Sequence, residues 1–186
     1  LHQLLRAAER RIERALATLR ATPEAPRLEI AASLTALAWF RRARNDPEGT
    51  EEAKALFHEA LAILSAERGE NHLLTLSLRS NLASMLVDPA ARAREHEKIL
   101  ALRRAKLGDR HYMVANSWSA LAAAQVDAAA FVAAAAAYDH AHAIWVETDG
   151  PANPMALAAL RNRSRALDRG GEAVAAAASF RQLAAD

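Results

Sequence analysis

Apolar side chains recur every three or four residues along nearly the whole chain, which is the spacing of one buried face of an α-helix. Residues 1–20 show the pattern clearly, with an apolar stripe formed by Leu4, Leu5, Ala8, Ile12, Ala15, Leu16 and Leu19. Gly and Pro, six of each, interrupt the pattern at only a few points. The sequence therefore predicts an all-α protein.

One helical segment recurs along the chain. The stretch that begins Phe57-His58-Glu59-Ala60-Leu61 returns at His96, at Tyr138 and at Phe180, so that the copies follow one another at nearly constant intervals. Such self-similarity at a fixed period is the signature of a repeat architecture, in which each unit stacks on the next.

A glycine-containing loop keeps the same period. It reads Gly69-Glu70-Asn71-His72, then Gly108-Asp109-Arg110-His111, then Gly150-Pro151-Ala152-Asn153, and its glycines follow the same intervals as the helical segment. A glycine just past the last turn of a helix takes the left-handed conformation that ends it. Two sets of features in the same register indicate a genuine repeat.

Each repeat is predicted to be a helical hairpin within a single array over residues 1–186. The units span 28–68, 75–107, 114–148 and 155–183, with 1–20 as the second helix of a unit cut off upstream. Their first helices are expected at 28–42, 75–87, 114–126 and 155–168, and their second helices at 51–68, 92–107, 128–148 and 172–183. Because the chain begins in mid-pattern, we expect it to be part of a longer protein.

Composition argues against several classes of function. The net charge is +2 and acidic residues are interspersed with basic ones, which disfavours nucleic-acid binding. The longest uncharged tract, Ala128–Tyr138, is too short to span a membrane, so a cytoplasmic protein is expected. The absence of cysteine excludes disulfides and thiolate chemistry.

Neither catalysis nor a bound cofactor or metal is predicted. His140 and His142 are two residues apart and diverge on a helix, while His72 and His111 occupy equivalent loop positions that indicate a structural role. The sequence contains no nucleophile elbow and no glycine-rich phosphate loop. We therefore expect a protein that is not an enzyme.

The repeat resembles the tetratricopeptide repeat (TPR). Trp118, Leu121 and Ala122 match the first-helix pattern of that family, and Phe131, Ala134, Tyr138 and Ala141 match the second helix. The period, at about 42 residues longer than that of the ordinary TPR, resembles that of the kinesin-light-chain-like subtype, as does the G-x-x-H loop. This subtype also occurs in bacterial signalling proteins. The resemblance implies an α-α superhelix, or solenoid, whose first helices form a concave wall that binds a protein or peptide.

The resemblance also implies which residues face that wall. They are Trp39, Arg42, Ser80, Asn81, Asn116, Ser119, Arg161, Asn162 and Arg165. Asn side chains can pair with an extended peptide backbone, and Arg161, Arg165 and Arg169 form an i, i+4, i+8 stripe suited to an acidic partner. The paired Asn common in that subtype survive only as Asn81 and Asn162.

Other roles for these residues stay open at this point. Trp39 fits inter-repeat packing, the arginine stripe fits a solvated face, and Asn81 and Asn116 fit local capping. The alternative function is a structural or regulatory segment of a larger signalling protein, for example one attached to a serine/threonine kinase or an ATPase. Such a segment would self-associate or pack on its own neighbouring domain through the alanine-rich helix Ala128–Ala143.

Overall fold

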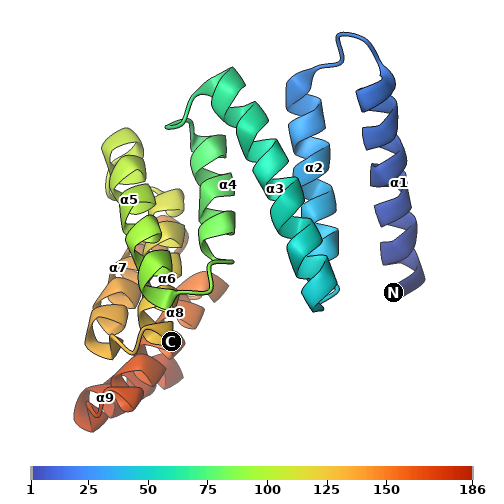
Figure 1. The fold of residues 1–186 in the computed structure, drawn as a ribbon. Coiled ribbons are helices and arrows are strands. Elements are labelled where there is room, and N and C mark those ends of the chain that lie inside the picture. The colour runs from blue at the N-terminus through green and yellow to red at the C-terminus, as the bar shows by residue number, and fades with distance from the viewer. Residues whose placement is uncertain (1, 186) are drawn as a thin grey trace. The chain divides into compact units, whose positions relative to one another are not determined.

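The computed structural model describes the backbone of residues 2–185 and the side chains of residues 7–181. Within these limits the chain forms α-helices and no strand (Figure 1). The helices are α1 (His2–Ala21), α2 (Arg27–Ala43), α3 (Pro47–Arg68), α4 (Leu73–Ala83), α5 (Pro89–Leu107), α6 (Tyr112–Asp127), α7 (Phe131–Asp149), α8 (Pro154–Arg169) and α9 (Ala173–Ala185). The predicted stripe members Leu4 and Leu5 have side chains outside the described residues.

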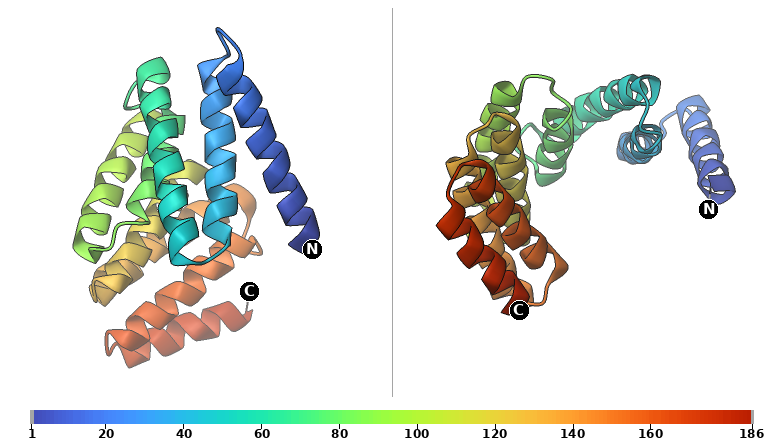
Figure 2. Two further views of the ribbon diagram at one scale, coloured as in Figure 1. Left: turned by 45° about the vertical axis from the view of Figure 1, so that its right-hand side comes forward. Right: turned by 90° about the horizontal axis from the view of Figure 1, so that it is seen from below.

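The helices form two compact units, which divide in the sequence between Leu82 and Ala83. In unit 1, α2 packs against both α1 and α3. In unit 2, α5 packs on α6, α6 on α7, α7 on α8, and α8 on α9 (Figures 1 and 2). Short turns join these neighbours, so that each unit contains helical hairpins.

Large and small apolar residues alternate in the core of each unit. In unit 1 the ring of Phe57 is fully buried, and Leu34, Ala38, Ala53 and Ala60 are buried as well. In unit 2 the core combines Trp145 and Tyr138 with a row of alanines. Full burial of one large apolar side chain contributes about 1.5–3 kcal/mol, so these rings dominate packing. The alanine-rich stretch of α7 buries Ala134, Ala137 and Ala141 inside unit 2.

Two second helices begin earlier than predicted, at Pro47 in place of Glu51 and at Pro89 in place of Arg92. In each case an aspartate caps the helix and a proline occupies its first turn. The Asp46 carboxylate accepts a hydrogen bond from the backbone N–H of Gly49 at 2.6 Å, and the Asp88 carboxylate accepts from Ala90 and Ala91. Proline tolerates this position because its missing N–H has no helical partner there.

Two other predicted boundaries were wrong because the helices are shorter than predicted. The helix α7 begins at Phe131 and not at Ala128, because Ala129 has φ +58° and breaks the helix before it. The helix α4 ends at Ala83 and not at Val87, and the N–H of Leu86 bonds back to the carbonyl of Ala83 in a turn. The remaining boundaries lie within two residues of the predicted ones.

The repeated glycine loop has one geometry in all three copies. Gly69, Gly108 and Gly150 have φ values of +89°, +77° and +88°, in the region where a side chain is strained. Three residues later, His72 and His111 accept a hydrogen bond through Nδ1 from the backbone N–H two residues on, at 3.2 and 3.1 Å. Asn153 does the same through Oδ1 at 2.7 Å. The predicted structural role of His72 and His111 is confirmed.

No described helix is both long and apolar enough to cross a lipid bilayer.

Candidate peptide-binding grooves

An apolar groove lies in unit 1 between α2, the end of α3, and α4. Its volume is about 630 Å³, within the range of ligand pockets. The residues that line it are Leu28, Ala31, Ala32, Thr35, Ala36, Trp39, Leu64, Arg68, Leu74, Ser77, Leu78 and Asn81. We call this the unit 1 groove.

Trp39 forms one end of the unit 1 groove. Its indole meets the buried ring of Phe57 edge to face, with centroids 5.6 Å apart, yet 45% of the residue is exposed. The Arg42 guanidinium lies 5.3 Å from the indole centroid, a cation–π arrangement. Trp39 is therefore both anchored to the core and presented to solvent, a combination suited to contact with a ligand.

Some polar side chains of the unit 1 groove have hydrogen-bond partners within the protein, and others do not. The hydroxyls of Thr35 and Ser77 donate to the carbonyls of Ala31 and Leu73 within their own helices. The Asn81 amide and the Arg68 guanidinium have no hydrogen-bond or ion-pair partner among the described residues. These two side chains keep their hydrogen-bonding capacity for a ligand.

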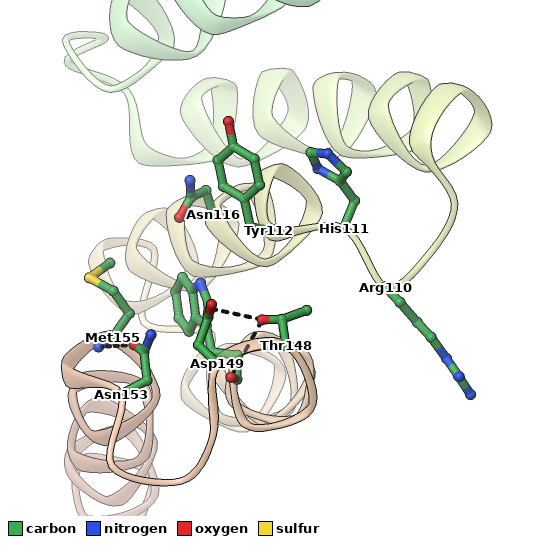
Figure 3. Close-up of a pocket in the computed structure, with 9 residues that line it drawn as sticks. Arg110, His111, Tyr112, Asn116, Thr148, Asp149, Asn153 and Met155 are labelled. Atoms are coloured by element: carbon green, nitrogen blue, oxygen red, sulfur yellow. Dashed lines mark hydrogen bonds between the residues drawn. The ribbon is translucent and has the colours of Figure 1, made fainter.

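A second pocket, of about 750 Å³, lies in unit 2 at the start of α6 and α8 and the end of α7 (Figure 3). The residues that line it are Arg110, His111, Tyr112, Asn116, Trp145, Thr148, Asp149, Asn153 and Met155. We call it the Asp149 pocket. Tyr112 is 55% exposed and its ring lies 4.7 Å from that of His111, whereas Trp145 is buried.

The structure places the nine predicted site residues in three settings. Trp39 and Asn81 come together in the unit 1 groove, and Arg42 flanks Trp39. Asn116 lines the Asp149 pocket. Ser80, Ser119, Arg161, Asn162 and Arg165 line neither pocket.

The predicted arginine stripe on α8 is not uniform. Arg161 and Arg165 are exposed and make no ion pair with any described residue. The third member, Arg169, stacks on Phe131 with its guanidinium carbon 4.6 Å from the ring centroid. Arg163, which sequence analysis did not select, pairs with Asp139 at 3.0 Å and donates to Ser179 at 2.9 Å.

Trp118, which matches the first-helix pattern of the repeat, has a structural role. It packs partly buried against the unit 2 core and stacks on His140, with ring centroids 4.4 Å apart. His142 lies elsewhere, with Nδ1 3.0 Å from the carbonyl of Ala156. No group of three or more potential metal ligands forms within the described part of the chain.

Among the described residues, His96 has the most strongly shifted pKa, and it is buried in unit 2 and lines neither pocket. Burial lowers its pKa from 6.5 to about 4, and the nearby positive charges of Arg92 and Arg103 act in the same direction. Its Nε2 lies 3.3 Å from the Ser84 hydroxyl. His96 is thus a neutral core residue.

Sequence reasoning missed Leu28, Arg68, Tyr112, Asp149 and Met155 as pocket residues. All of them lie at or near helix ends, and none belongs to the first-helix positions that the prediction placed on the concave wall. All except Leu28 also lie close in sequence to a glycine of the repeated loop. Proximity to these glycines is therefore the signal that would have identified them.

Neither a protein-family model nor a curated protein sequence matches the chain. Solved structures do match. The kinesin-light-chain TPR-like repeats of Podosopora anserina share 21% identity with a TM-score of 0.77, over 99% of this chain and 87% of that one, and a variant of the same protein gives 0.79. BtubC (BKLC) from P. vanneervenii shares 17% identity with a TM-score of 0.81, over 96% of this chain and 71% of that one. The chain therefore has the helical-repeat fold of kinesin-light-chain-like TPR proteins.

Proposed function

We propose that this protein is a non-catalytic scaffold whose unit 1 groove binds an extended segment of a partner protein. Its fold is commonly a protein-interaction scaffold and is typically non-enzymatic. The observation that carries the proposal is the exposed, core-anchored indole of Trp39 in an apolar groove that also holds the unpartnered amide of Asn81.

The length of the unit 1 groove suits a short extended peptide. Its lining runs along α2 from Leu28 to Trp39, which is about 16 Å at the rise of an α-helix. About five extended residues cover that distance. The Asn81 amide can donate to and accept from the backbone of such a segment.

The charged residues beside the unit 1 groove indicate which kind of peptide segment it would bind. Arg42 lies beside Trp39, and Arg68 lines the groove at the end of α3, which the Arg27–Glu67 ion pair joins to the start of α2. Between them the lining is apolar, with Leu64 and Leu78. The favoured occupant is a segment with an apolar side chain in the middle and carboxylates on either side.

Selection from a displayed peptide library tests this proposal, followed by titration of the selected peptides into the full chain. Selected peptides should share an apolar residue flanked by Asp or Glu. The pair of substitutions Trp39→Ala and Asn81→Ala should weaken their binding about tenfold or more, because an aromatic anchor and a backbone contact are both lost. Lys98→Ala, on an exposed face of α5, is the matched control and should leave affinity unchanged. Equal affinity for the double variant and the original chain would contradict the proposal.

Self-association is the second candidate, and α9 favours it. Phe180 occupies the repeat position that holds Phe57 and Tyr138, which are buried, yet it is 43% exposed, and Val174 is 84% exposed. A second copy of the chain could cover this face. Light scattering across a concentration series would show a dimer that Phe180→Ser dissociates, whereas a monomer at all concentrations would remove this candidate.

A further inference from the structure

The end of α7 differs in charge from the ends of α1, α2, α3, α5 and α8. All of these carry a basic residue in the last turn. A cation there is stabilised by the negative end of the helix dipole. By contrast, α7 has no basic residue in its last turn and ends with Glu147 and Asp149. Two carboxylates at that end are unfavourable unless a cation accompanies them.

Two other carboxylates near helix ends do have a cation. Asp127, the last residue of α6, pairs with Arg92. Glu147 pairs with Arg110 at 2.9 Å. Asp149 has no ion pair with any described residue. One of its carboxylate oxygens accepts from the Thr148 hydroxyl at 2.8 Å, and the other accepts from no described group. Asp149 thus brings an uncompensated negative charge to its pocket.

The walls of the pocket suit an organic cation. The Tyr112 ring and the Met155 thioether belong to residues that are about half exposed, and the Asn116 side chain lies beside Tyr112 (Figure 3). Aromatic faces attract cations electrostatically, and apolar walls contact the methylene stem of a long charged side chain. Arg110 does not fill the pocket, because its side chain extends away from the other lining residues (Figure 3).

We propose that the Asp149 pocket binds the guanidinium group of an arginine side chain on a partner protein. A guanidinium presents parallel N–H donors that match a carboxylate, and its flat face stacks on aromatic rings. Here the free oxygen of Asp149 accepts from the guanidinium, and the Asn116 carbonyl oxygen is a second acceptor. A metal ion would require more oxygen ligands than these two side chains provide. This proposal is independent of the unit 1 groove, since it concerns only residues of unit 2.

The test is a titration of N-acetyl-arginine N-methylamide into the full chain at constant ionic strength. Binding is monitored through the NMR chemical shifts of the backbone amides and side chains. Saturable shifts are expected at Tyr112, Asn116 and Asp149. Asp149→Asn, which keeps the size of the side chain, should weaken binding about fivefold or more because the charge-assisted bond is lost. The corresponding citrulline compound, which is neutral and of the same shape, should bind at least as weakly to the original chain.

Glu97→Gln is the matched control, because it removes one exposed carboxylate from α5, outside the pocket. Arginine binding to this variant should equal that of the original chain. The spectrum of Asp149→Asn, outside the pocket, shows whether the fold is retained. Equal binding of citrulline, unchanged binding by Asp149→Asn, or shifts confined to other residues would overturn the proposal, and so would the absence of saturable shifts.

Discussion

The unit 1 groove and the Asp149 pocket occupy corresponding places in the repeat, but one equivalent residue in each has the opposite charge. When Gly69 is aligned with Gly150, the groove residues Leu64, Arg68 and Leu74 align with Trp145, Asp149 and Met155 of the pocket. The same helix ends and the same glycine loop therefore frame both sites. A fixed backbone presents Arg68 in one unit and Asp149 in the other, so that ligand chemistry is varied by side chains alone.

The first helices show the same contrast. When Leu37-Ala38 is aligned with Leu121-Ala122, Ala123 stands in the place of Trp39, the aromatic end of the unit 1 groove. In the same alignment Tyr112 and Asn116 correspond to Leu28 and Ala32. The groove is thus apolar and carries the cation of Arg68, whereas the pocket is more polar and carries Asp149 together with Arg110, which pairs with Glu147. Four predictions test the properties of the two units and of their sites.

The largest effect is expected from Phe57→Ala. Phe57 is fully buried in unit 1 and supports the indole of Trp39. Its loss leaves a cavity that should lower the free energy of unfolding by about 3–5 kcal/mol. Amide hydrogen exchange should show this loss in α2 and α3, together with weaker binding of peptides to the groove.

Unit 2 provides the control for this comparison. Titration of the arginine compound should be unchanged in Phe57→Ala, because the Asp149 pocket lies in unit 2. Equal loss of exchange protection throughout α5–α9 would show that the two units unfold together.

The second prediction concerns pH and His96 in unit 2. Its pKa is about 4 in the folded protein, against 6.5 for the free side chain. Below pH 6.5 the unfolded chain takes up a proton that the folded chain does not bind until about pH 4, so stability falls over this window. The loss should reach about 3 kcal/mol by pH 4.

Denaturant unfolding of the original chain and His96→Gln, from pH 7 to pH 4, measures this contribution. The variant should be less stable at pH 7, and the gap should narrow steadily as the pH falls. A constant gap would show that His96 titrates normally in the folded protein.

The third prediction concerns the glycine loops that frame the two sites. Gly69 and Gly150 both have positive φ, and an added Cβ would meet no atom within 4 Å at either position. The cost of Gly→Ala is therefore backbone strain alone, about 1–3 kcal/mol, because φ near +89° with ψ near 160° is a conformation that only glycine adopts readily. Thermal unfolding should give the same loss for Gly69→Ala and Gly150→Ala, and a marked difference would mean that the two loops are not equivalent.

These loops could be predicted from the sequence because their glycines and the capping His or Asn are local features. The starts of α3 and α5 differ from the predicted ones although Asp46-Pro47 and Asp88-Pro89 carry the N-cap signal, because a proline can either interrupt a helix or occupy its first turn. The positive φ of Ala129 has no local signature, because alanine rarely adopts it.

The residues of the candidate sites could be predicted from the sequence only where the repeat pattern itself identifies them. Trp39 and Asn81 lie on the faces of first helices, which the repeat pattern identifies. Arg68 and Asp149 become pocket residues only when the end of a second helix meets the next first helix, a tertiary arrangement. The stacking of Arg169 on Phe131 is likewise a contact between distant residues.

The smallest effect, and the most direct test of the charge contrast, comes from exchanging the two helix ends. Asp149→Arg places a cation at the negative end of the α7 dipole, in the position that Arg68 occupies in α3. It should raise the free energy of unfolding by about 0.3–1 kcal/mol at low ionic strength, whereas Arg68→Asp should lower it by a similar amount. Salt should diminish both changes, because the charges are exposed. If Asp149→Arg instead lowers stability, its carboxylate must stabilise the fold through the Thr148 hydroxyl, and the idea that it is kept for a ligand loses its physical basis.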